Sequence, residues 1–213
     1  MSTVRLSHVS KKIGNAVVLK DICYEFQGGR IYHLKGINGC GKTMLLRSIC
    51  GLIIPTTGTI EIDQKVLHQD IDFPVSLGAL IESPAFIAQF NGFTNLKLLA
   101  DLNNAASREE IVEAIKSVGL DPSDKRPFRK YSLGMRQRLG VACAIMGHPK
   151  LIILDEPFNA LDKNGVQLVC SAIKAERDKG ALVIMASHDT TINLDEMVDE
   201  HIEMEEGRLC AAQ

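Results

Sequence analysis

The sequence predicts an α/β fold in which a mostly parallel sheet core carries an antiparallel β subdomain and a helical subdomain. A glycine-rich turn, Gly36–Thr43, stands between an apolar run and a segment with helical spacing. Two further apolar runs, 151–154 and 181–186, alternate with amphipathic segments, as expected of strands buried between helices. The adjacent carboxylates Asp155 and Glu156 follow the first of these runs.

Composition and charge are those of a globular protein with one sizeable core. The chain has 213 residues, of which 46% are hydrophobic and 23% are charged, so it is long enough to fold alone. Its formal net charge of −2 creates no global basic field, and we therefore expect no nucleic-acid partner.

The cysteines and the apolar runs bound the cellular compartment. Six cysteines are scattered without a C-x-x-C pair, which argues against a zinc site or a disulfide framework and indicates a reducing cytosol. The first eight residues lack the apolar core of a signal peptide, and no run approaches the ~18 residues that a membrane span needs. Work at a membrane would need another protein to span it.

The N-terminal part has the alternation of β-strands. Residues 4–26 are strand-like, and 27–30 predict a hairpin turn into the strand 31–35. The segment 58–63 predicts another strand. Together these segments predict an antiparallel sheet attached to the core.

The turn Gly36–Thr43 has the residue order of a phosphate-binding loop. Its glycines let the backbone wrap around phosphate oxygens, Lys42 supplies a positive charge, and the Thr43 hydroxyl can ligate Mg²⁺. Backbone N–H groups at the start of the following helix also favour an anion. We therefore expect a P-loop NTPase fold that binds ATP and Mg²⁺. The expected nucleotide contacts from this stretch are Gly36, Ile37, Asn38, Gly39, Cys40, Gly41, Lys42, Thr43 and Met44.

The middle of the chain predicts a helical subdomain over about 83–140. Thr94 is expected to cap a first helix, and Ser107 with Glu110 fits the capping-box spacing before a second one. Gly119 is expected to end that second helix.

After this subdomain the α/β alternation resumes. Residues 134–146 and 165–179 predict amphipathic helices, and the apolar runs 151–154 and 181–186 predict strands buried on both faces. The segment 203–209 predicts a small hairpin. Without repeats or a low-complexity linker, we expect residues 1–213 to form a single domain with no appended regulatory domain.

Asp155 and Glu156 are the predicted catalytic carboxylates. In open α/β sheets, ligands lie outside the carboxyl ends of the strands, so both should lie near the phosphate loop. Asp155 can hold Mg²⁺ through water, and Glu156 can act as general base on the attacking water. A carboxylate pair after a strand is more often a solvated loop start, but the upstream phosphate loop favours catalysis.

The order of these motifs resembles that of the ATP-binding-cassette (ABC) ATPases over nearly the whole chain. By this resemblance 36–43 is the Walker A motif, 151–156 is Walker B and Ser132–Gln137 is the signature motif. Asn159–Asp162 resembles the D-loop, which adds Asp162 to the nucleotide site, and His188 resembles the switch histidine. The resemblance implies that His188 contacts the γ-phosphate and helps to hold the attacking water beside Glu156 and Lys42.

The resemblance also implies a head-to-tail dimer, in which each ATP lies between the Walker A motif of one subunit and the signature motif of the other. Ser132 and the backbone of Gly134 would contact the ATP of the partner, which is a second copy or a paralogous ATPase subunit. ATP then holds the dimer together, and hydrolysis releases it.

Several positions depart from the family pattern. The signature reads Tyr131–Met135 in place of Leu-Ser-Gly-Gly-Gln, a form similar to that of bacterial peptide-antibiotic resistance and export proteins. Glu82 replaces the Q-loop glutamine, and its carboxylate can meet Mg²⁺ or water while it adds a negative charge. Ile13 stands where an aromatic residue usually stacks on adenine, which predicts loose base selectivity. Cys40 is interpreted as a small residue that fits the loop, with a reactive thiol as the alternative.

The leading interpretation is the ATP-hydrolysing subunit of an ABC transporter that drives a separate integral-membrane permease. It would be cytoplasmic and peripheral on the inner face of the cell membrane. The alternatives are a soluble mechanical or regulatory ATPase of the same fold, and a nucleotide-binding module without catalysis, against which Glu156 and His188 speak. The transported substrate and the direction of transport stay open.

Overall fold

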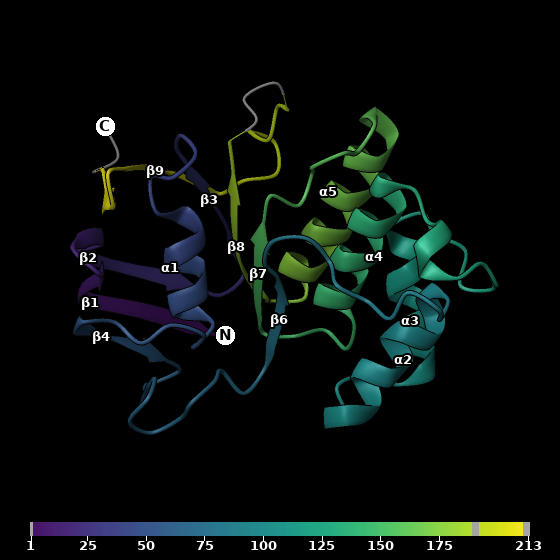
Figure 1. Ribbon diagram of the computed structural model, residues 1–213, viewed down its shortest axis with the longest axis horizontal. Coiled ribbons are helices and arrows are strands. Elements are labelled where there is room, and N and C mark those ends of the chain that lie inside the picture. The colour runs from purple at the N-terminus through teal and green to yellow at the C-terminus, as the bar shows by residue number, and fades with distance from the viewer. Residues whose placement is uncertain (1, 189–191, 211–213) are drawn as a thin grey trace.

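The computed structural model describes residues 2–188 and 192–210 (Figure 1). Its strands are β1 (Thr3–Ile13), β2 (Ala16–Gln27), β3 (Ile31–Lys35), β4 (Thr57–Ile62), β5 (Lys65–Val66), β6 (Leu77–Leu80), β7 (Leu151–Asp155), β8 (Leu182–Ser187), β9 (Glu200–Glu205) and β10 (Arg208–Leu209). Its helices are α1 (Lys42–Ile49), α2 (Gly92–Asn103), α3 (Arg108–Ser117), the 3₁₀ helix η1 (Phe128–Lys130), α4 (Leu133–Ile145) and α5 (Lys163–Asp178).

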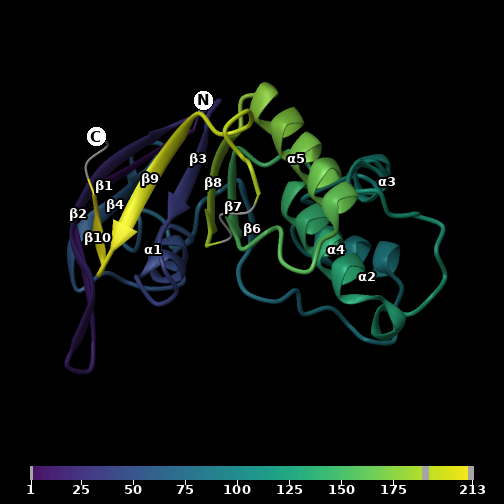
Figure 2. The ribbon, with the colours of Figure 1, turned by 90° about the horizontal axis from the view of Figure 1, so that it is seen from above.

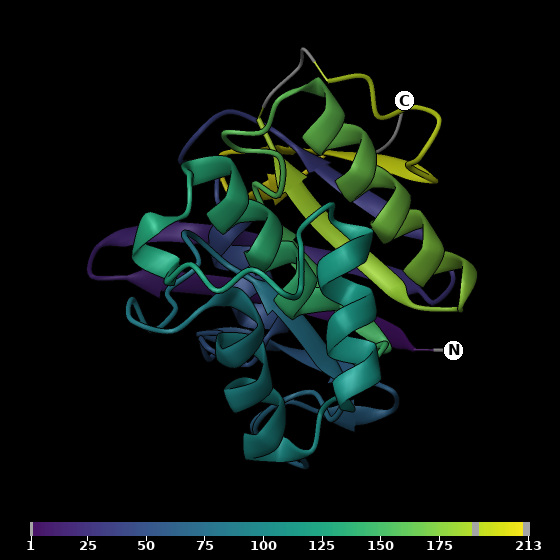
Figure 3. The same cartoon turned by 90° about the vertical axis from the view of Figure 1, so that its right-hand side faces the viewer.

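The strands form two sheets. The antiparallel sheet has the order β2-β1-β4-β5, and the six-stranded sheet has the order β10-β9-β3-β8-β7-β6. Strands β9, β3, β8, β7 and β6 run parallel, and β10 pairs antiparallel with β9. Helix α1 lies between the two sheets, and α2 to α5 lie on the outer side of the larger one (Figures 2 and 3). The predicted parallel core, antiparallel subdomain and C-terminal hairpin are confirmed.

Apolar side chains fill both faces of the six-stranded sheet. Along β7 and β8 the side chains alternate between two clusters, so that Ile153 and Ile184 face α1 whereas Ile152 and Val183 face α4 and α5. All residues of both strands are buried. This two-sided burial explains why the sequence shows continuous apolar runs there.

The predicted hairpin at 27–30 is wrong. Strands β2 and β3 belong to different sheets, and Gly29 donates its N–H to Ala181 O at 3.0 Å where the chain crosses between them. Strand β3 is buried from Ile31 to Leu34, so it needs parallel neighbours and a cover on both faces, which a hairpin with β2 would not supply. The hairpin of this region joins β1 to β2.

The helix starts match the sequence in part. Ser107 and Glu110 form the predicted capping box of α3, and Gly119, with φ of 71°, follows its end. Thr94 is not a cap, because the Asn91 side chain caps α2 and accepts the Thr94 N–H at 2.8 Å. The short strand β6 was not predicted. No helix in the described ranges combines the length and the apolar character needed to cross a membrane.

Candidate functional site

The carboxyl ends of four parallel strands lie at one edge of the larger sheet. Lys35 at the end of β3 pairs with Ser187 at the end of β8, and Asp155 at the end of β7 pairs with Ala186. Strand β6 runs parallel to β7 and ends at the same edge. The predicted site residues that follow these strands along the chain are Gly36, Glu82, Glu156 and His188. The topology therefore brings the chain segments that carry them to one edge of the sheet.

The glycine-rich loop after β3 leaves the start of α1 open. Gly41 is the N-cap of α1 with φ of 114°, and no side chain caps the helix. A Cβ at Gly41 would lie 2.9 Å from Val18 O, whereas at Gly39 (φ of 81°) it would meet nothing within 4 Å. Both backbones favour glycine, and the space above Gly39 is free. Uncapped N–H groups at a helix N-terminus suit a phosphate.

Lys42 places a buried ammonium group over this loop. Its Nζ donates to Gly36 O at 2.7 Å and to Ile37 O at 3.1 Å, and it lies 3.9 Å from Cys40 Sγ. Both oxygen partners are neutral carbonyls. The charge is thus held in place without a carboxylate contact, which fits the residues to an anionic phosphate chain.

The other loop residues differ in their exposure to solvent. Ile37 and Asn38 form the exposed crest of the loop, and Cys40 is buried with its side chain inward. Met44 packs at the margin of the core on the α1 side. The buried Cys40 fits its interpretation as a small packing residue. Ile13, at the expected base site, is half exposed at the end of β1.

Thr43 and Asp155 meet at the start of α1. Thr43 Oγ1 donates to Asp155 Oδ2 at 2.7 Å. Burial raises the pKa of Asp155; the Thr43 hydrogen bond opposes this, and the neighbouring Glu156 charge reinforces it. A hydroxyl and a carboxylate are oxygen ligands of the kind that Mg²⁺ prefers, so the pair fits this ion.

Glu156 and His188 form the second contact at this edge. His188 Nδ1 and Glu156 Oε1 are 2.6 Å apart, and the Glu156 N–H donates to Ala186 O at 2.8 Å. Glu156 has φ of 51°, an unusual backbone for a non-glycine residue that turns the chain sharply at the end of β7. A carboxylate oriented by an imidazole can accept a proton from water.

Glu82 lies at the same edge but pairs elsewhere. Its carboxylate forms an ion pair with Arg47 of α1, and its backbone has φ of 62°. The sequence motifs did not identify Arg47 as a residue near this site. The two residues are 35 positions apart, and their meeting depends on how β6 docks beside α1, for which the sequence carries no spacing signal.

A cavity of about 890 Å³ opens beside the loop crest. Gly36, Asn38 and His188 line one part of it, and His33 and His201 another. The pKa of His33 is lowered to about 4, chiefly because the ring is buried and also because His201 lies next to it. His33 is therefore neutral at pH 7 and adds no positive charge to the cavity.

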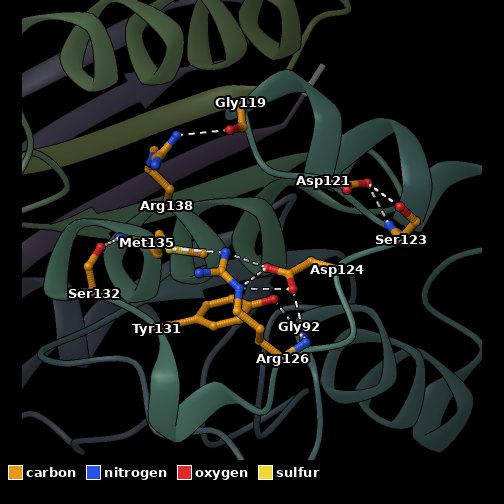
Figure 4. A network of polar contacts seen from close by, with 10 residues as sticks. All are labelled: Gly92, Gly119, Asp121, Ser123, Asp124, Arg126, Tyr131, Ser132, Met135 and Arg138. Atoms are coloured by element: carbon orange, nitrogen blue, oxygen red, sulfur yellow. Dashed lines mark hydrogen bonds and ion pairs between the residues drawn. The ribbon is translucent and has the colours of Figure 1, made fainter.

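The signature residues are not brought to the loop of their own chain. Ser132 is the N-cap of α4 and accepts the Met135 N–H on Oγ at 3.2 Å (Figure 4). Helix α4 packs on the face of the sheet opposite to α1, so the two helix starts are separated by the sheet. Leu133 is 69% exposed, which leaves this helix start open to solvent.

Helix α4 instead contacts the segment that follows β7 in its own chain. Gln137 Nε2 donates to Glu156 O at 2.9 Å, and a Cβ at Gly134 would lie 2.9 Å from Ala160 O. Asp162 caps α5 by accepting the Gly165 N–H on Oδ1 at 2.7 Å. Asp162 thus has a structural task here, and its contact with nucleotide stays a prediction.

A polar network fixes the chain just before the signature (Figure 4). The Arg126 guanidinium donates hydrogen bonds to the Asp124 carboxylate, with Nη2 2.7 Å from Oδ2. Its central carbon lies 6.0 Å from the centre of the Tyr131 ring. The Tyr131 hydroxyl accepts the Gly92 N–H at 3.2 Å. The Arg126 contact lowers the pKa of Asp124, which keeps the pair ionised. Tyr131, the residue before Ser132, is thereby anchored to α2.

Comparison with known proteins finds the same family throughout. The family described as ABC transporter matches residues 19–159. The uncharacterized ABC transporter ATP-binding protein YybJ of Bacillus subtilis is 43% identical over 97% of this chain and 94% of its own. The bacitracin transport ATP-binding protein BcrA of Enterococcus faecalis is 35% identical over 97% of this chain and 67% of its own.

Two further likenesses extend the comparison. The lantibiotic transport ATP-binding protein SrtF of Streptococcus pyogenes is 31% identical over 87% of this chain and 80% of its own. A solved dimeric ATP-binding cassette, in a post-hydrolysis state bound to ADP and Pi, has a TM-score of 0.86 and 22% identity. It covers 99% of this chain and 97% of its own. At that identity the likeness establishes the fold.

Proposed function

Because this chain belongs to the ABC transporter family and is an ATP-binding ATPase subunit of it, we propose that it dimerises head to tail around MgATP and powers a separate integral-membrane permease. The observation that carries the MgATP site in this proposal is the contact of Thr43 with Asp155 at 2.7 Å. It joins the phosphate loop to the carboxylate end of β7, where Glu156 follows.

The residues at this sheet edge would have different roles in ATP binding and hydrolysis. The loop and the Lys42 ammonium bind the phosphates, and Thr43 and Asp155 would hold Mg²⁺, which screens phosphate charge when it is bound. Glu156 takes a proton from the attacking water, and His188, in contact with Glu156, orients that carboxylate.

The open start of α4 supports the dimer. Ser132 and Gly134 lie across the sheet from the loop of their own chain, and the neighbouring Leu133 is exposed. We infer that this surface completes the nucleotide site of a partner, which is a second copy or a paralogue. The solved cassette of the same fold, bound to ADP and Pi, is a dimer, which is consistent with a dimer of this chain.

Subunit mixing tests the shared site. Leu133→Glu and Lys42→Ala should each abolish hydrolysis as homodimers. An equal mixture should regain roughly a quarter of the wild-type rate, because half of the dimers are mixed and one of their two sites has both intact surfaces. Leu133→Glu should fold, because the position is exposed and a carboxylate suits a helix start. Leu102→Glu, on the exposed surface of α2, is the control for a new carboxylate on an exposed helix. If the mixture of Leu133→Glu and Lys42→Ala were as inactive as its two components, this result would contradict the shared site.

The permease is expected to dock beside Glu82. Exposed apolar side chains flank this position along the chain: Phe73 and Val75 before it, Ile87 and Phe90 after it. Relatives named for bacitracin and lantibiotic transport support a transporter rather than a soluble mechanical ATPase. We further propose that residues 1–213 form a single nucleotide-binding domain with its helical subdomain at about 83–140. Its place would be cytoplasmic, on the inner face of the cell membrane.

Membrane co-purification tests the docking. We expect the wild-type chain to recover an integral-membrane protein from detergent-solubilised membranes. Ile87→Ser should reduce that recovery severalfold while ATP hydrolysis by the isolated chain is unchanged. Val17→Ser on β2 is the matched control, because its side chain is 46% exposed against 49% for Ile87. Equal recovery by the two variants would place the permease elsewhere, and recovery of only soluble proteins would contradict transport.

A further inference from the structure

We propose that Arg47 is a positioning residue for the nucleotide site, which neutralises and orients Glu82 so that a carboxylate can stand beside the bound phosphates and Mg²⁺. The inference rests on the proposed function. It assigns a task to a residue of α1 that no motif marks, and it explains how this chain accommodates a glutamate at the position of the Q-loop.

The backbone places the two side chains together. Arg47 lies on α1, the helix that begins at Lys42 in the phosphate loop. Glu82 follows the end of β6, at the sheet edge where Asp155 ends β7 and Glu156 follows it. The Glu82 backbone has φ of 62°, and Arg47 Nη2 contacts its Oε1. An arginine on the helix of the loop thus holds a glutamate on the neighbouring strand end.

The charges at this edge show why a pair is needed. Glu82 is a third carboxylate at the sheet edge where Asp155 and Glu156 lie, because Leu80 at the end of β6 pairs with Leu154 of β7. Lys42 is directed to loop carbonyls, and the His188 ring is directed to Glu156. Within the described residues, Arg47 is the cation that forms an ion pair with Glu82. Removing Arg47 would leave an added negative charge facing the phosphates.

The Arg47–Glu82 ion pair should contribute little to the stability of the fold. The side chains are 32% and 64% exposed, and exposed ion pairs contribute little to stability. Repulsion of a multiply charged ligand is different, because the uncompensated carboxylate would act on several phosphate charges at once. The contact also leaves the second carboxylate oxygen, Oε2, without a hydrogen bond among the residues described here. That oxygen remains available to water or to Mg²⁺.

A double-mutant cycle tests the proposal. The variants are Arg47→Met, Glu82→Gln and the two combined, with MgATP affinity measured by calorimetry and hydrolysis by phosphate release. Arg47→Met should raise the Kd and KM for MgATP roughly three- to tenfold, with a smaller change in kcat. The double variant should lie within about twofold of Glu82→Gln, because no carboxylate then needs neutralising. Arg47→Lys should restore affinity to within about twofold of wild type.

A matched ion pair provides the control. Arg5 pairs with Glu25 at 3.0 Å and with Glu61 at 3.8 Å, so Arg5→Met removes exposed ion pairs on the other sheet. It should leave the MgATP affinity unchanged. Thermal unfolding checks that Arg47→Met folds as wild type does. A cycle in which Arg47→Met weakens binding equally with and without Glu82→Gln would overturn the proposal, as would unchanged affinity in Arg47→Met.

The outcomes separate this inference from the proposed function. A wild-type chain that bound no MgATP, or that bound it as well after Lys42→Ala, would contradict the nucleotide site itself. A wild-type chain that binds and hydrolyses ATP, together with an additive cycle, would reject the task of Arg47 alone.

Discussion

Glu156→Gln is expected to lower the rate of ATP hydrolysis by roughly 10²- to 10⁴-fold and to leave MgATP binding intact. The carboxylate contacts His188 at 2.6 Å and follows Asp155 directly, so it is the base nearest to the attacking water in the proposed site. An amide keeps the shape and a hydrogen bond to His188 but cannot take the proton. The uncleaved nucleotide should then hold the two subunits together, and light scattering should show a stable dimer in MgATP.

The control for this change is Glu109→Gln on the exposed surface of α3, which should hydrolyse ATP at the wild-type rate. Thermal unfolding should not distinguish the two variants. Turnover of Glu156→Gln within a few-fold of wild type would rule out the general-base assignment. A variant that stayed monomeric in MgATP would contradict the nucleotide-held dimer but not the assignment of the base.

Lys42→Ala is expected to weaken ATP binding by roughly ten- to hundredfold, because a hydrogen bond to a charged group contributes about 1.5–3 kcal/mol. The Lys42 ammonium is buried and already directed into the loop by Gly36 O and Ile37 O. Its loss removes the positive charge that the loop presents and leaves those carbonyls without their donor. Calorimetry with MgATP measures the change directly.

Lys42→Met separates charge from packing at this position. Methionine fills much of the volume of the lysine stem but carries no charge, so its ATP affinity should be as poor as that of Lys42→Ala. If Lys42→Met bound ATP normally while Lys42→Ala did not, loop packing would be the cause. Unchanged affinity in both variants would remove Lys42 from the phosphate site.

Local chemistry and strand order explain what the sequence predicted. The buried strands β7 and β8, the capping box at Ser107 and the glycine-rich loop are set by residues close together in the chain. The placing of Asp155 and Glu156 beside that loop followed from a general rule about parallel sheets. These features needed no knowledge of how distant segments dock.

Two of the failures depend on such docking, and the third is a local choice between two capping residues. The residues after Gln27 have the composition of a hairpin turn, but β3 pairs with parallel strands in the other sheet. Asn91 rather than Thr94 caps α2, a choice between two residues of good capping chemistry that the periodicity does not resolve. Arg47 meets Glu82 across 35 positions, and neither side chain reveals its partner in the sequence.

The hydrogen bond from Gln137 to the Glu156 carbonyl bears on how two sites in one dimer would communicate. In the proposed dimer, this bond would connect α4, which begins at the partner-facing Ser132, to the proposed general base Glu156 of its own chain. A shift of Glu156 on loss of the γ-phosphate would therefore move the surface presented to the other nucleotide. We expect hydrolysis at one site to change the ATP affinity of the other.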